Sequence, residues 1–165
     1  MSQNESEIAA SEGSSEQYVV FSIADEDYCI EILKVQEIIR SMPITWLPHR
    51  PASVEGVINL RGEIIPVINL RVKFGLEKKP YTKFTRVLIG QIEERLVGMI
   101  VDGVNEVVTI NEDNVETAPG SESGRRKTEY IRGVARVDDR VIILLNVARI
   151  LAEEEIVAIK DLPSA

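Results

Sequence analysis

The chain has 165 residues, which corresponds to about one domain at roughly 150 residues per domain. Its formal net charge of −8 argues against nucleic-acid backbones and anionic membrane surfaces as partners, because both attract basic faces. One cysteine, Cys29, cannot form an internal disulfide, and one histidine, His49, cannot build a multi-histidine metal site.

The first 16 residues are rich in Ser and Glu and offer almost nothing to bury, so we expect a disordered acidic tail over residues 1–16. This segment lacks the basic and apolar regions of a signal peptide. Elsewhere, no apolar run approaches the ~20 residues that a membrane span needs. We therefore expect a cytoplasmic protein without direct membrane insertion.

Val and Ile together supply 40 of the 165 residues, which favours a mainly β fold. Alternating or continuous apolar runs predict strands over residues 17–23, 28–32, 57–60, 64–70, 85–92, 96–101, 106–110, 130–137 and 141–145. Polar residues predict turns between these strands. One of them, Asp25-Glu26-Asp27, lacks the further ligands and the glycine of an EF-hand loop and is therefore interpreted as a turn rather than a calcium site.

The remaining segments are predicted to be helical or irregular. Residues 31–40 fit both a helical and a strand pattern, and we expect a short helical turn followed by a strand. One helical turn is predicted over 52–55 and a long polar loop over 117–129. Asn146 can cap a C-terminal helix over 147–160.

An internal duplication is the most informative pattern in the chain. Residues 35–39 match residues 104–108 at an offset of 69. Residues 64–70 match residues 141–147 at an offset of 77. A repeat this long indicates duplicated lobes rather than a solenoid, whose repeats are 20–50 residues.

The duplication predicts one domain over 17–160 with two lobes, at about 17–80 and 81–146, each with enough short strands for a small barrel. The copies differ where Arg61-Gly62 is replaced by Asp138-Asp139. Because a turn needs only polar, turn-forming residues, the shape of the turn does not by itself require Arg61.

The sequence contains no recognised catalytic constellation. Cys29 and His49 could in principle form a nucleophile–base pair, but a buried strand cysteine is far more common, and His49 is most simply a solvated loop residue. Glu37 and Glu106 could be paired carboxylates, but the duplication explains them as equivalent positions in two lobes. These patterns favour a protein that acts by contact, with no cofactor and no metal, over a small β-barrel enzyme or a nucleic-acid-binding double barrel.

Two further features leave alternatives open. Arg125-Arg126-Lys127 is either a solvated loop or a docking patch for an acidic partner. Trp46 is either a half-buried anchor of its loop or an interface hot spot, a role in which tryptophan is enriched.

The longest motif carries a resemblance to a known family. Residues 56–70, GVINLRGEIIPVINL, together with residues 28–38, 101–107 and 130–133, closely resemble the CheW family of bacterial chemotaxis adaptors. The resemblance covers about residues 17–155. The chain departs from the family pattern at Asn69, where an aspartate is usual, and in a variable loop within residues 120–127.

This resemblance implies two SH3-like five-stranded β-barrel subdomains around a shared core, with a C-terminal α-helix. It also implies a non-catalytic adaptor that binds the regulatory, CheW-like domain of the histidine kinase CheA and the cytoplasmic tips of methyl-accepting chemoreceptors. Such an adaptor would be recruited to receptor arrays at the inner membrane face. The receptor-facing residues of the family fall on Val35, Glu37, Asn59, Leu60, Arg61 and Gly62. A simpler role, in which Arg61 pairs with a nearby acid such as Glu37, is compatible with that assignment.

Overall fold

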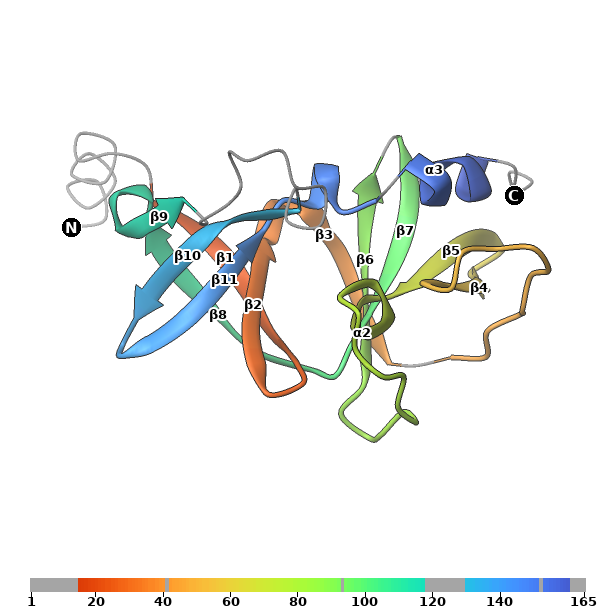
Figure 1. Cartoon of the computed structure of the whole chain (residues 1–165), viewed down its shortest axis with the longest axis horizontal. Helices are drawn as coiled ribbons and strands as arrows, with labels where there is room; N and C mark the ends of the chain where they lie inside the picture. The colour runs from red at the N-terminus through yellow and green to blue at the C-terminus, as the bar shows by residue number, and fades with distance from the viewer. Residues whose placement is uncertain (1–14, 41, 93, 118–129, 152, 161–165) are drawn as a thin grey trace.

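A computed structural model describes residues 15–40, 42–92, 94–117, 130–151 and 153–160. The strands form two sheets that lie side by side along the long axis of the molecule (Figure 1). The basic loop residues Arg125-Arg126-Lys127 and residues 1–14 of the predicted acidic tail lie outside the described residues. The prediction of a disordered tail over 1–16 is wrong for Ser15 and Glu16, because both pair with another strand. The mainly β class is confirmed.

Sheet A has six strands in the order β8-β1-β2-β11-β10-β9. These strands are β1 (Ser15–Ile23), β2 (Glu26–Glu31), β8 (Gly103–Asn111), β9 (Val115–Thr117), β10 (Ile131–Val137) and β11 (Arg140–Leu145). All neighbours pair antiparallel except β2 and β11, which pair parallel.

Sheet B has five strands in the order β3-β6-β7-β5-β4. These strands are β3 (Val35–Arg40), β4 (Val54–Leu60), β5 (Glu63–Asn69), β6 (Arg86–Ile92) and β7 (Arg95–Val101). Here the parallel pair is β5 and β7. Within the described residues, the outermost strands of each sheet do not pair with each other, so the expected barrels are two open sheets.

The two sheets do not follow the predicted lobes at 17–80 and 81–146. The β1–β2 hairpin pairs with strands of the second repeat in sheet A, and the β6–β7 hairpin pairs with strands of the first repeat in sheet B. The two copies of the repeat have therefore exchanged their first hairpins. Short connections explain the exchange, because three residues join β2 to β3 and Asp102 alone joins β7 to β8.

Two-residue turns close the hairpins. Both turn residues have positive φ at Ala24-Asp25 (52° and 67°), Arg61-Gly62 (53° and 88°) and Asp138-Asp139 (49° and 67°). This conformation matches the right-handed twist of the flanking strands. The first turn lies earlier than the predicted Asp25-Glu26-Asp27, because Glu26 and Asp27 already pair within β2.

The helical predictions are partly confirmed. A short 3-10 helix, η1 (Ile32–Lys34), precedes β3 as expected. The helical turn predicted over 52–55 is shorter in the structure: Val54 N–H donates to the Pro51 carbonyl oxygen around Ala52-Ser53, and Val54 then pairs with Ile68 as the first residue of β4.

Three asparagines cap short helices, and one of them, Asn111, begins the 3-10 helix η2 (Glu112–Asn114). The predicted cap at Asn146 accepts a hydrogen bond from Ala148 N–H, but the helix that it begins stops after one turn as η5 (Val147–Arg149). The C-terminal helix α3 (Glu153–Lys160) follows separately. Asn69, the equivalent residue of the first repeat, caps a helix that the sequence did not reveal, α2 (Leu70–Lys73).

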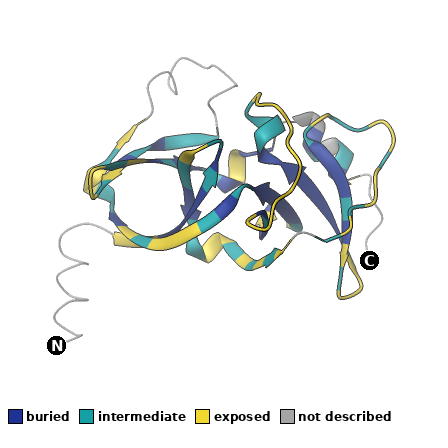
Figure 2. Cartoon of the chain, turned by 90° about the horizontal axis from the view of Figure 1, so that it is seen from below, coloured by how far each residue is buried: buried dark blue, intermediate teal, exposed yellow. Residues whose placement is uncertain are grey.

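One large core joins the two sheets. It combines residues of sheet A such as Phe21 and Ile30, residues of sheet B such as Leu88 and Met99, and Ile159 of α3, all less than 5% exposed. Smaller clusters lie on sheet A and on sheet B separately. Buried residues follow the strands, whereas many turns and loops are exposed (Figure 2). The two sheets therefore share one core, as the resemblance implied.

Candidate functional site

The β4–β5 turn and strand β3 border a shallow hollow of about 450 Å³ that is open to solvent. We refer to this hollow and its rim as the Arg61 site. Its lining residues are Gln36, Glu37, Leu60, Arg61, Glu63, Ile89 and Leu96. The site belongs entirely to sheet B, and it combines charged groups with three aliphatic side chains.

A bidentate ion pair forms the rim of the Arg61 site. Arg61 Nη1 donates to Glu37 Oε2 at 3.1 Å, and Arg61 Nη2 donates to Glu37 Oε1 at 2.5 Å. These hydrogen bonds lower the pKa of Glu37 and raise the pKa of Arg61. The Arg61 side chain is nonetheless 70% exposed. An exposed ion pair contributes little to stability, but the two hydrogen bonds fix the guanidinium and the carboxylate relative to each other at the surface.

The turn itself is held by Asn59, whose Oδ1 accepts a hydrogen bond from Gly62 N–H at 2.8 Å. Leu60 precedes Arg61 and packs against the sheet B cluster. Five of the six predicted residues, Glu37, Asn59, Leu60, Arg61 and Gly62, therefore lie together.

Val35 does not join them. It pairs with Gly90, whereas Glu37 pairs with Ile89, so Gln36 is an extra residue that forms a β-bulge. Because cross-strand partners share a face, the bulge places Val35 on the opposite face of sheet B from Glu37. Val35 packs there against the shared core. In sequence, residues 35, 37 and 39 alternate regularly, which hides the bulge.

Sheet A carries an equivalent arrangement. Asn105 forms the corresponding bulge between β8 and β1, and Glu106 pairs with Arg140. Arg140 stands two residues after the position that matches Arg61, and its Nη1 also lies 3.8 Å from Asp27 Oδ2. Glu37 and Glu106 therefore lie on different sheets, each paired with an arginine, and they are not a carboxylate pair.

The alternative nucleophile–base pair is also absent from the described structure. Cys29 is fully buried in sheet A, and this burial raises the pKa of its thiol to about 12. His49 is an exposed residue of the connection between β3 and β4 of sheet B. The structure does not bring the two side chains together, and the thiol is protonated at neutral pH.

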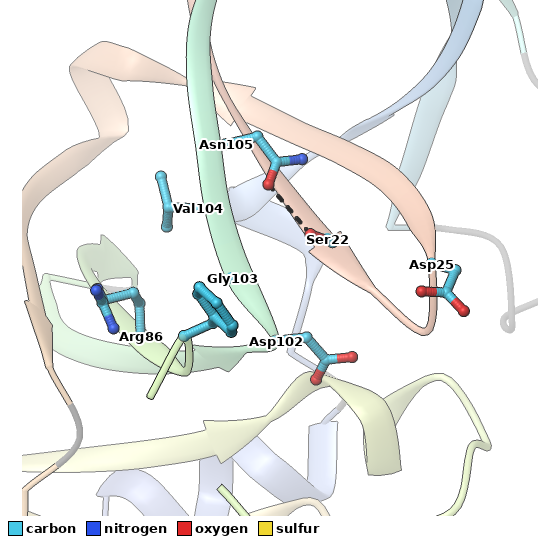
Figure 3. A pocket seen from close by; sticks show the side chains of 8 residues that line it. Ser22, Asp25, Arg86, Asp102, Gly103, Val104 and Asn105 are labelled. Carbon is cyan, nitrogen blue, oxygen red and sulfur yellow. Dashed lines mark hydrogen bonds between the residues drawn. The ribbon is translucent and has the colours of Figure 1, made fainter. Parts of the chain in front are cut away.

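A second hollow of about 310 Å³ lies beside the Asn105 bulge (Figure 3). Three of its polar side chains, Ser22, Asp102 and Asn105, already have partners within the protein. Ser22 Oγ donates to Asn105 Oδ1 at 3.2 Å, and Asp102 Oδ2 accepts from Arg71 Nη1 at 2.5 Å and from Ala24 N–H at 2.8 Å. This hollow therefore reflects the packing of the β7–β8 link rather than a ligand site.

Neither a metal site nor a membrane span is found in the described part of the chain. No group of three or more His, Cys, Asp or Glu side chains could hold a metal ion among these residues. None of their helices is long and apolar enough to cross a membrane.

Comparisons with known proteins agree on one family. The model of the CheW-like domain matches residues 17–155. The chemotaxis protein CheW of Klebsiella aerogenes is 34% identical over 152 residues, which is 92% of this chain and 91% of that protein. The chemotaxis protein CheW of Helicobacter pylori is 34% identical over 138 residues, which is 84% of this chain and 82% of that protein. The crystal structure of the scaffolding protein TtCheW from Thermoanaerobacter tengcongensis superposes with a TM-score of 0.77 at 37% identity, covering 85% of this chain and 94% of that one.

Proposed function

The chain belongs to the CheW-like domain family, and we propose from this premise that it is a non-catalytic chemotaxis adaptor coupling chemoreceptors to the histidine kinase CheA. The match over residues 17–155 is the observation that carries the proposal, because it extends over both sheets and the link between them. Relatives of similar length are chemotaxis proteins CheW, and a structural relative is described as a scaffolding protein.

The Arg61 site is the proposed surface for the cytoplasmic tip of a methyl-accepting chemoreceptor. Its exposed guanidinium can pair with an acidic or amide side chain of the tip. Leu60 and Leu96, which are half-buried, provide apolar area beside that charge. Asn59 and Gly62 fix the turn that presents Arg61, and Val35 contributes indirectly by packing the bulge against the core.

The second partner is the regulatory, CheW-like domain of CheA. That proposal rests on the family resemblance, and we assign no residues of this chain to it. An adaptor with these two partners works in the cytoplasm, at receptor arrays on the inner membrane face.

Charge reversal at the Arg61 site tests the receptor assignment. We expect Arg61→Glu and Glu37→Lys to fold normally, because both side chains project into solvent. Each should bind a receptor cytoplasmic fragment at least about tenfold more weakly and should lose receptor-dependent kinase activation. Circular dichroism and thermal melting check the fold, and reconstitution of receptor, kinase and adaptor checks function.

Glu106→Lys is the matched control, because it makes the same change at the equivalent position of sheet A. This variant should retain receptor binding. If Arg61→Glu and Glu37→Lys bound the receptor fragment as well as Glu106→Lys does, the Arg61 site would not be the receptor surface.

A further inference from the structure

Trp46 is a large aromatic residue that remains 61% exposed on the connection between β3 and β4. Two cations contact its ring. The guanidinium carbon of Arg50 lies 4.0 Å from the ring centroid, and Nζ of Lys78 lies 4.7 Å from it. We refer to Trp46, Arg50 and Lys78 as the Trp46 surface.

One buried residue, Glu55, anchors both cations, Lys78 through its carboxylate and Arg50 through its backbone carbonyl oxygen. Glu55 on β4 is 4% exposed, and its Oε2 lies 2.9 Å from Lys78 Nζ. Its other oxygen, Oε1, accepts a hydrogen bond from Asn69 Nδ2 at 3.0 Å. Arg50 Nε donates to the Glu55 carbonyl oxygen at 3.2 Å. The cations are thus attached to sheet B itself, and the Trp46 ring that they contact is held in a defined place.

The charge of this surface is opposite to that of the chain. Arg50 and Lys78 lie beside Trp46, and the acid paired with Lys78, Glu55, is buried. On either side of Lys78 in the chain, the exposed Glu77 and Lys79 offset each other, so the cluster keeps a net positive charge. The whole chain, in contrast, has a formal net charge of −8. A locally basic surface with an exposed tryptophan is complementary to an acidic segment that carries an apolar side chain.

We propose that the Trp46 surface docks an acidic, partly apolar segment of a protein partner. Carboxylates of the segment pair with Arg50 and Lys78, and an apolar side chain covers the Trp46 ring. This surface is separate from the Arg61 site. The segment containing Trp46 bridges to β4 through Thr45 and Val57, and Arg61 lies four residues beyond Val57, roughly 13 Å along the strand.

The only tryptophan of the chain reports directly on this surface. The full chain is titrated with a synthetic peptide of three Glu-Glu-Leu-Glu repeats while Trp46 fluorescence is followed. Binding should shift the emission to shorter wavelength and reduce quenching by acrylamide, because the ring leaves water. Arg50→Glu and Lys78→Gln should each weaken binding about tenfold. Lys83→Gln is the matched control, since Lys83 makes its cation–π contact with Phe84 instead.

Three results would overturn the proposal: no emission shift, peptide affinity in both Trp46-surface variants equal to that of the unsubstituted chain, or an equal shift with phosphatidylserine vesicles. The last would identify a membrane surface instead of a protein segment. Arg50→Glu is also tested for receptor-fragment binding, which should be unchanged. This measurement distinguishes a failure of the proposal for the Trp46 surface from a failure of the proposal for the Arg61 site.

Discussion

The ion pair that joins α3 to α2 allows a quantitative prediction. Glu155 on α3 is 2% exposed and pairs with Lys73 of α2, which is itself almost buried. Ser53 Oγ donates a hydrogen bond to the same carboxylate. In Glu155→Ala, the Lys73 ammonium would remain buried without its anion.

Removing one partner of a buried ion pair costs about 3–5 kcal/mol, because the remaining charge is uncompensated. Lys73 Nζ also lies 5.8 Å from the centroid of the Tyr130 ring, which keeps part of its attraction. We therefore expect Glu155→Ala to lose about 3 kcal/mol of unfolding free energy. At about 2–4 °C per kcal/mol for a chain of this size, the Tm should fall by about 6–12 °C.

Urea denaturation and calorimetry measure both quantities. Replacing both charges, in Lys73→Met with Glu155→Leu, should recover most of the loss, because no unpaired charge remains. Glu77→Ala removes an exposed carboxylate and should change the free energy of unfolding by less than about 0.5 kcal/mol. A loss below about 1 kcal/mol in Glu155→Ala would refute the reasoning and show that apolar packing alone holds α3.

Two other predictions concern backbone and pH. Gly56→Ala should destabilise the fold by more than about 2 kcal/mol, because the new Cβ would lie 2.1 Å from the carbonyl oxygen of Thr45. Gly62→Ala should cost only about 1 kcal/mol, because its φ of 88° is unfavourable for alanine but no atom lies near the new Cβ. Urea titrations measure both losses, and equal losses would contradict this prediction. Burial raises the pKa of Cys29 from its usual 9.0, and that of Tyr18 from its usual 10.0, to about 12. The unfolded chain therefore ionises first, so the stability from these groups is complete below pH 9 and is lost between about pH 9 and 12. Cys29→Ala should lower the free energy of unfolding by about 1–2 kcal/mol at pH 8 through lost packing. Above pH 9, the free energy of unfolding of this variant should fall less steeply with pH than that of the unsubstituted chain. An equally steep fall would exclude the thiol as its source.

Most strands were predictable from the sequence because the β-branched residues alternate and the polar turns are short. The assignment of strands to sheets was not. Each sheet contains one parallel pair, β2 with β11 and β7 with β5, and each of these pairs joins strands of different repeats. Since the two repeats offer equivalent partners, local patterns cannot distinguish a hairpin kept in its own repeat from an exchanged one.

The candidate site shows the same limit on a smaller scale. Arg61 stood out in the sequence because the turn did not require it. Its possible pairing with Glu37 was also considered from the sequence, and the structure shows this pair. The bulge at Gln36 could not be seen, because one extra residue leaves the alternation of β3 intact in sequence. Its only local sign is Gly90, where a Cβ would lie 2.7 Å from the Lys34 carbonyl oxygen.

The exchanged hairpins have a consequence for how this molecule can be divided. A cut in the connection between α2 and β6 leaves β1–β5 on one fragment and β6–β11 on the other, so each fragment holds part of both sheets. Neither fragment contains a complete sheet, and each lacks the strands at the centre of one. Two copies of a single repeat that lent each other their first hairpin would build the same pair of sheets, as in a domain-swapped dimer. The chain has the architecture of such a dimer with its two subunits covalently joined, so we expect separately produced halves to fold only when they are mixed.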